Sequence, residues 1–397
     1  MPGNIPEPLE RSGAAHLSTS PSPTAASPRG QAIISPVVDA LCVGGLSLLL
    51  LLPLLLSGRA DLVIIGAGFQ AWITALVNMP HFMASYRMIY RSRAIALEHR
   101  WAAFYVPALL LAYIAFAIVM SRTTDLYVTI LMTVQGGYLA WHYTGQAWGM
   151  MATYAWMDGR PFGNLERQLV RGGLYILLAW HVVWFFHHGF PGWQLGPAYD
   201  ALTLLSAVAL AGGLVGFGLM YLRTGRVPPG RALIAWAAIF VWYAAMARDP
   251  RAIFWVQIAH AVQYMMFPIR VEVNRTMRGE HGGPRRLARH MALFVVILLA
   301  VSVVMAVLVP AGAMSVMADW LGRRPGEVAG MSLLAFLNIH HYFTDGVMWK
   351  LRNPMVRQDL FGHLPARGPA AATAPAPTAP VPAPAPVLSR RARRRRG

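Results

Sequence analysis

Five histidines lie inside long apolar stretches of this sequence: His81, His142, His260, His340 and His341. An ionisable side chain in such a stretch is costly and usually faces the interior of a helical bundle. Imidazole is the commonest metal ligand in proteins and suits iron, copper and zinc. We therefore predict one buried metal site. Its ligands are His81, His142, His260 and His341, and either His340 or Asp345 completes the set. Iron is the expected ion, with copper and zinc as alternatives.

Amide and carboxylate side chains accompany these histidines at helical spacing, since residues three or four positions apart share one face of a helix. Gln146 and Gln263 each follow a histidine by that distance, and Asn338 and Asp345 flank His341 in the same way. A metal-bound histidine usually passes its second N–H to a carboxylate, a carbonyl or water. We therefore assign supporting catalytic roles to four polar residues: Asp345, Gln146, Gln263 and Asn338. A lone histidine in a membrane helix often only bonds a neighbouring helix, so the prediction depends on the histidines acting together.

Ten apolar runs must position these side chains, and each is close to the roughly 20 residues that a membrane-spanning helix needs. Hydrophobic residues make up 56% of the chain and charged residues only 13%, against about 25% charged in an average soluble domain. The sequence therefore predicts an all-α fold, a polytopic transmembrane helical bundle with about ten spanning helices. The expected spans are 32–57, 62–88, 101–120, 126–155, 168–187, 200–222, 231–247, 251–269, 290–312 and 328–349.

Composition divides the chain into three regions. Residues 1–30, rich in Pro, Ser, Gly and Ala, are expected to form a disordered N-terminal segment, and residues 31–350 form the transmembrane helical domain. Residues 351–397 are expected to be a flexible Pro/Ala-rich tail whose basic end either attracts anionic lipid or is simply solvated. The single cysteine, Cys42, excludes an intrachain disulfide and a multi-cysteine metal site.

The net charge of +18 comes from arginines that concentrate in the loops after every second apolar run. Positive charge in short loops sets membrane topology and marks the cytoplasmic side, so it does not indicate a nucleic-acid partner. With ten spans, both termini are then cytoplasmic, and we expect a multi-pass protein of a bacterial inner membrane. The histidine-bearing runs all end on that side, which places their histidines in one layer of the inner half of the membrane.

Other polar residues in the apolar runs have open interpretations. His181 could join the histidine layer from the opposite side, whereas His187 and His188 are expected at the outer interface as solvated turn residues. Asp39 could relay protons, or it could lie at the cytoplasmic edge. Pro80 is expected to bend its helix beside His81.

The arrangement of single histidines on several membrane helices resembles that of the bacterial Brp/Blh carotene dioxygenases. The likeness covers the second to the tenth span. It implies an iron-dependent, oxygen-using enzyme with a lipophilic substrate. Histidine-box desaturases differ, because they use HxxxH and HxxHH spacings, whereas this chain has only the pairs His187-His188 and His340-His341.

Three functions are compatible with these residues. The favoured one is a metal-dependent membrane oxygenase or oxidase, whose partners are a lipophilic small molecule such as a lipid or isoprenoid, molecular oxygen and membrane lipids. The second is a proton- or ion-coupled transporter with a His/Asp relay, although the sequence has no clear internal repeat of the kind that many transporters show. The third is a bis-histidine haem carrier.

Overall fold

The computed structural model describes residues 31–58, 66–279, 283–350 and 353–364, and these contain helices and no β-strand. The predicted disordered segment 1–30 lies outside the described residues. The α-helices are α1 (Pro36–Ala40), α2 (Leu46–Ser57), α3 (Ala67–Ile73), α4 (Met79–Tyr90), α5 (Arg93–Glu98), α6 (Val106–Met120), α7 (Leu126–Met157), α8 (Asn164–Gly189), α9 (Gly196–Thr224), α10 (Gly230–Arg248), α11 (Ile253–Arg278), α12 (Pro284–Val303), α13 (Val309–Leu321), α14 (Arg323–Met348) and α15 (Pro354–Phe361).

Four π-helical turns join shorter helices into longer ones: η1 (Leu41–Gly45), η3 (Thr74–Asn78), η4 (Trp101–Tyr105) and η7 (Val304–Leu308). In three cases the next α-helix carries a proline at its second position: Pro80 in α4, Pro107 in α6 and Pro310 in α13. Proline lacks the N–H that an α-helical turn requires, and π-turns are a common way to keep a helix continuous around such a defect. Before Pro80, where a bend was expected, the helix has the π-turn η3, which ends at Asn78.

Seven helices or joined helices among the described residues are long and apolar enough to cross a membrane: Pro36–Ser57, Trp101–Met120, Asn164–Gly189, Gly196–Thr224, Gly230–Arg248, Pro250–Arg278 and Pro284–Leu321. The chain therefore has the architecture of a helical membrane protein. The expected number of about ten spans is not confirmed by this criterion. The remaining three expected segments are also helical, as α3–η3–α4, α7 and α14, but they are less apolar.

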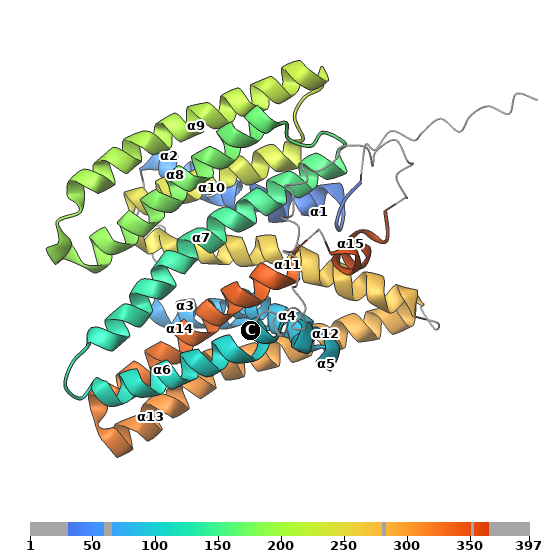
Figure 1. The fold of residues 1–397 in the computed structure, drawn as a ribbon. Coiled ribbons are helices and arrows are strands. Elements are labelled where there is room, and N and C mark those ends of the chain that lie inside the picture. The colour runs from blue at the N-terminus through green and yellow to red at the C-terminus, as the bar shows by residue number, and fades with distance from the viewer. Residues whose placement is uncertain (1–30, 59–65, 280–282, 351–352, 365–397) are drawn as a thin grey trace, which may run out of the picture.

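The helices form one bundle around α11 (Figure 1). On one side, α8 and α9 make a hairpin in which α8 packs against α7 and α10. In turn, α10 packs against α7 and α2. On the other side, α14 packs against α4, α6, α7 and α13, while α11 itself contacts α4, α12 and α15. The histidine-bearing helices α4, α7, α11 and α14 thus meet between the two sides, near the middle of the bundle.

The first part of the predicted tail contains a helix, α15, over Pro354–Phe361. Asn353 caps the N-terminus of α15 by accepting a hydrogen bond from the Met355 N–H. Asp359 of α15 pairs with Arg91 and Arg278, and the Asn274 side chain donates to the Asp359 and Leu360 carbonyls. These contacts hold α15 against α4 and α11. Residues 365–397, with the basic end, lie outside the described residues.

Candidate metal centre

Four helices bring one histidine each to a common point. The histidines are His81 of α4, His142 of α7, His260 of α11 and His341 of α14, and one ring nitrogen of each lies within 4.8 Å of those of the other three. All four side chains are buried, with at most 6% of any of them exposed. The sequence prediction that histidines from these four segments meet is therefore confirmed.

The ring nitrogens have a spacing that suits one shared ion. The Nε2 atoms of His142 and His260 are 3.0 Å apart, and two nitrogen ligands about 2 Å from one ion lie roughly 3 Å from each other. The ring of His81 lies edge-on to those of His260 and His341, at centroid distances of 5.3 and 4.7 Å. The four rings thus surround one small space and do not stack in pairs.

Several of these ring nitrogens have no hydrogen-bond partner although they are buried. They are Nε2 of His81, Nδ1 of His260, and both ring nitrogens of His341. Buried polar atoms are nearly always paired in folded proteins, so unpaired nitrogens within this cluster indicate a missing partner. Nδ1 of His81 contacts the Asn78 carbonyl oxygen of its own helix. That contact fixes the ring and leaves Nε2 as the ligand atom, as is common for metal-bound histidines. The donor set therefore fits a metal ion.

Asp345 joins the centre one helical turn after His341. Its Oδ2 atom lies 3.4 Å from Nε2 of His341 and 3.9 Å from Nε2 of His142. Its Oδ1 atom accepts hydrogen bonds from the Ser85 and Tyr264 hydroxyls, at 2.7 and 3.0 Å. The carboxylate thus has one oxygen held by hydroxyls and one oxygen turned towards the histidines.

Three residues of this hydroxyl network, Ser85, Tyr264 and Trp349, were not predicted as site residues. Ser85 lies four positions after His81, so helical spacing alone could have identified it. Trp349 follows the C-terminus of α14 and donates its Nε1–H to the Tyr264 hydroxyl at 2.9 Å. Its place depends on how α14 ends beside α11, which no local pattern in the sequence reveals.

The two glutamines pair with each other and do not contact the imidazole nitrogens. Gln146 donates to the Gln263 side-chain carbonyl at 2.8 Å and to the His260 backbone carbonyl at 3.2 Å. Gln263 in turn donates to the Val43 carbonyl at 2.6 Å. These bonds link α7, α11 and the η1 turn, so the glutamines position helices around the centre.

His340 and Asn338 lie apart from the centre. His340 donates its Nε2–H to the Ala102 carbonyl at 2.9 Å and stacks on Tyr86 at a centroid distance of 5.0 Å. Asn338 is half-buried and donates to the Leu334 carbonyl of its own helix. The structure therefore places Asp345, and not His340, beside the cluster of His81, His142, His260 and His341.

His181 and Asp39 also occupy separate positions. Nδ1 of His181 is 2.9 Å from the Tyr243 hydroxyl, and the Tyr143 ring lies between His181 and His260. Asp39 accepts backbone N–H bonds from residues 33–35 and pairs with Arg231 at 3.4 Å. Asp39 thus fixes the start of the first helix.

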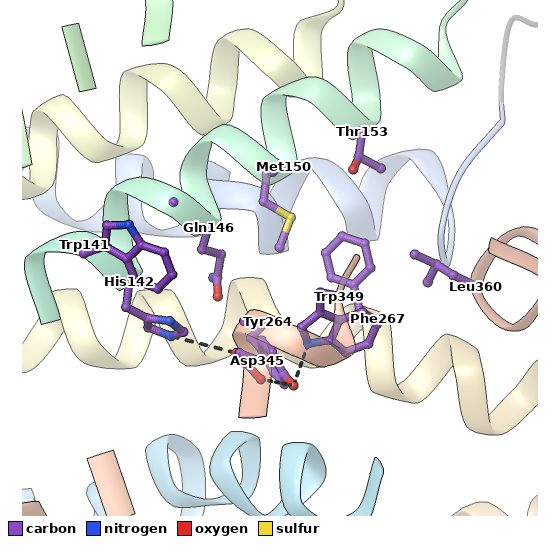
Figure 2. A pocket seen from close by; sticks show the side chains of 13 residues that line it. Trp141, His142, Gln146, Met150, Thr153, Tyr264, Phe267, Asp345, Trp349 and Leu360 are labelled. Carbon is purple, nitrogen blue, oxygen red and sulfur yellow. Dashed lines mark hydrogen bonds and ion pairs between the residues drawn. The ribbon is translucent and has the colours of Figure 1, made fainter. Parts of the chain in front are cut away.

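A cavity of about 270 Å³ adjoins the centre between α7, α11, α14 and α15 (Figure 2). His142, Tyr264 and Asp345 lie at one end of it, and Thr153 and Leu360 lie at the other. Between the ends the walls are mainly apolar, with Met150, Phe267 and Trp349 among the lining residues. The histidine cluster is therefore next to a space that can take a small apolar molecule.

Comparison with protein-family models, with curated proteins and with solved structures found no match to this chain. The functional argument therefore depends on the geometry of the site.

Proposed function

We propose that this chain is a membrane-embedded, metal-dependent oxygenase or oxidase that acts on a lipophilic substrate such as a lipid or isoprenoid. The observation that carries the proposal is the convergence of four buried histidines, each with one ring nitrogen within 4.8 Å of those of the other three. Burial supports a metal because unpaired imidazoles in an apolar interior are otherwise unfavourable. We place a single ion among His81, His142, His260 and His341.

Non-haem iron is the ion that we propose, with copper and zinc as alternatives, because imidazole binds all three. When bound, iron at such a site supplies coordination positions at which dioxygen can be activated. Asp345 would orient His341 through its Oδ2 atom, or bind the ion directly, while the Ser85 and Tyr264 hydroxyls hold its other oxygen. The enclosing helices exclude water from the centre, and the adjoining apolar cavity admits the substrate.

A proton- or ion-coupled transporter remains the second candidate, and one observation favours it. Asp345, Tyr264, Ser85 and Trp349 form a continuous hydrogen-bonded chain beside the histidines, and chains of this kind can relay protons within a membrane. The orphaned histidine nitrogens favour the metal enzyme, because a relay would use them as hydrogen-bonding groups.

We further propose that α3–η3–α4, α7 and α14 also cross the membrane, which gives ten spans with both termini in the cytoplasm of a bacterium. Arginines flank the proposed cytoplasmic ends of the site helices, as with Arg87 of α4 and Arg275 of α11, and positive charge favours that side. A reporter fused after the last residue tests this orientation. A reporter that is active only in the cytoplasm supports it, and one that is active only in the periplasm contradicts it.

The test of the proposed function is the metal content of the purified protein, measured by mass spectrometry together with its visible spectrum. We expect close to one non-haem iron or copper ion per chain, and loss of that ion in His81→Ala. A Soret band would instead indicate haem. Protein purified without chelators that contains no metal would contradict the enzyme and favour the transporter.

A further inference from the structure

The cavity beside the metal centre follows one face of α7. The α7 residues that line it are Trp141, His142, Gly145, Gln146, Gly149, Met150 and Thr153. These positions recur every three to four residues, and Trp141 and Thr153 are separated by about 18 Å at 1.5 Å per residue. A cavity with a volume of about 270 Å³ that extends over this length must be a narrow groove.

Three exposed glycines form the open parts of its walls: Gly145 and Gly149 on α7, and Gly346 on α14. A Cβ atom built at any of them would meet nothing within 4 Å. Some other helical glycines have a packing reason, as at Gly136, where a Cβ would lie 2.5 Å from the Phe185 ring. Glycine is the poorest helix former after proline, and at these three positions the lack of a side chain leaves the groove open.

The polar end of the groove coincides with the centre. His142 and Asp345 line that end and are at least nine-tenths buried, whereas Gly145, Gly149 and Gly346 are exposed along the side. The groove therefore opens sideways from the bundle at the depth of the histidines. A molecule that enters from the bilayer would reach His142 without passing through water.

We propose that this groove binds one slender hydrocarbon chain, acyl or prenyl, which lies along α7 with one segment beside His142 and Asp345. The inference rests on the proposed function of the histidine centre and names the substrate class that this centre takes. The apolar walls supply binding through burial of the chain. The narrow cross-section at Gly145 and Gly149 selects a linear or methyl-branched chain over a fused-ring lipid.

Photoreactive lipids test this proposal on the full-length protein in phosphatidylcholine nanodiscs. Three probes, each with a diazirine in its apolar part, are compared: a hexadecanoic acid, a geranylgeraniol and a cholesterol. Cross-linked residues are mapped by mass spectrometry, with labelling of the lipid-facing helix α9 as the internal reference. We expect the acyl probe, the prenyl probe or both to label the groove between Gly145 and Thr153 well above α9. The probe that labels the groove shows whether the bound hydrocarbon chain is acyl or prenyl.

Two α7 variants make the test specific. Gly149→Leu fills the groove and should reduce groove labelling at least tenfold without changing the labelling of α9. Gly137→Leu is the matched control, because Gly137 also has nothing within 4 Å of a built Cβ but does not line the groove. Gly149→Ala, which favours the helix, should give an intermediate reduction, and it keeps the test valid if the leucine variant fails to fold.

Groove labelling that stays at the α9 level, that is equally strong with the cholesterol probe, or that Gly149→Leu and Gly149→Ala leave unchanged would overturn the proposal. Metal content measured on the same samples separates the two ideas. A metal-loaded protein with an unlabelled groove contradicts the substrate inference alone. A labelled groove in a protein without metal contradicts the proposed function alone.

Discussion

The helices of the site and those at the edge of the bundle differ in how apolar they are. The most apolar window of the joined helix Pro284–Leu321 has a mean hydropathy of 3.2, and 17% of it is buried inside the protein. The corresponding window of Pro250–Arg278, which carries His260, has a mean hydropathy of 1.3 and is 50% buried. The other three site helices are less apolar still. In this chain, polarity marks the helices that face the interior.

The sharpest comparison is between two neighbouring histidines of α14. His341 faces the centre, and His340 bonds the Ala102 carbonyl. We expect His341→Ala to lower the metal affinity by more than about 100-fold, beyond the roughly 10–100-fold effect of losing an outer-shell partner. His340→Ala should retain the metal and lose only about 1–3 kcal/mol of stability, because a buried carbonyl loses its donor. Titration of the two apo-proteins with metal measures both metal affinities. Equal affinities would contradict the assignment of His341, and not His340, to the metal centre.

The carboxylate beside the histidines should have the next largest effect. We expect Asp345→Asn to lower the metal affinity about 10–100-fold. The Asp345 carboxylate lies 3.4 Å from Nε2 of His341 and would either orient that ring or bind the ion itself. Asp319→Asn, at an exposed position of α13, is the matched control and should bind metal as the wild type does. A metal affinity that Asp345→Asn leaves unchanged would remove this carboxylate from the centre.

The paired glutamines should affect stability more than metal binding. Gln263→Met keeps the shape of the side chain but leaves the Val43 carbonyl without its donor and removes one of the two acceptors of the Gln146 amide. We expect a loss of about 1–3 kcal/mol in the free energy of unfolding, with the metal-to-protein ratio unchanged. Thermal unfolding measures the loss, with Gln358→Met at an exposed position as control. Loss of the metal at full stability would mean that the amide acts at the ion itself.

The smallest effect concerns the contact that His363, just after α15, makes with α11. Burial lowers the pKa of His363, whose Nε2–H donates to the Ala32 carbonyl while Nδ1 accepts from Asn274. The unfolded chain therefore binds more protons between the folded pKa and about 6.5, so this contribution to stability is lost as the pH falls below about 6.5. The protection factors of the α15 amides, corrected for the pH dependence of intrinsic exchange, should be slightly lower at pH 5 than at pH 7.5. A pH dependence that persists in His363→Ala would contradict this.

The sequence predicted the helices and most of the centre because both follow from local patterns. Apolar runs located the helices, and helical spacing linked His341 with Asp345. The choice between His340 and Asp345 as the group that completes the set could not be predicted. Consecutive helical residues point about 100° apart, and the rotation of α14 is set by its packing against α4, α6 and α7. The α15 helix was missed because its stability depends on contacts with α4 and α11, not on its own composition.

X-ray absorption spectroscopy of the purified wild-type protein tests the central claim most directly, since it reports the ion and its ligands together. We predict one ion per chain with first-shell nitrogen ligands and the outer-shell scattering of about four imidazoles, reduced by one in His341→Ala and unchanged in His340→Ala. An ion bound by oxygen or sulfur without imidazole scattering, or no ion at all, would contradict a metal centre built from His81, His142, His260 and His341.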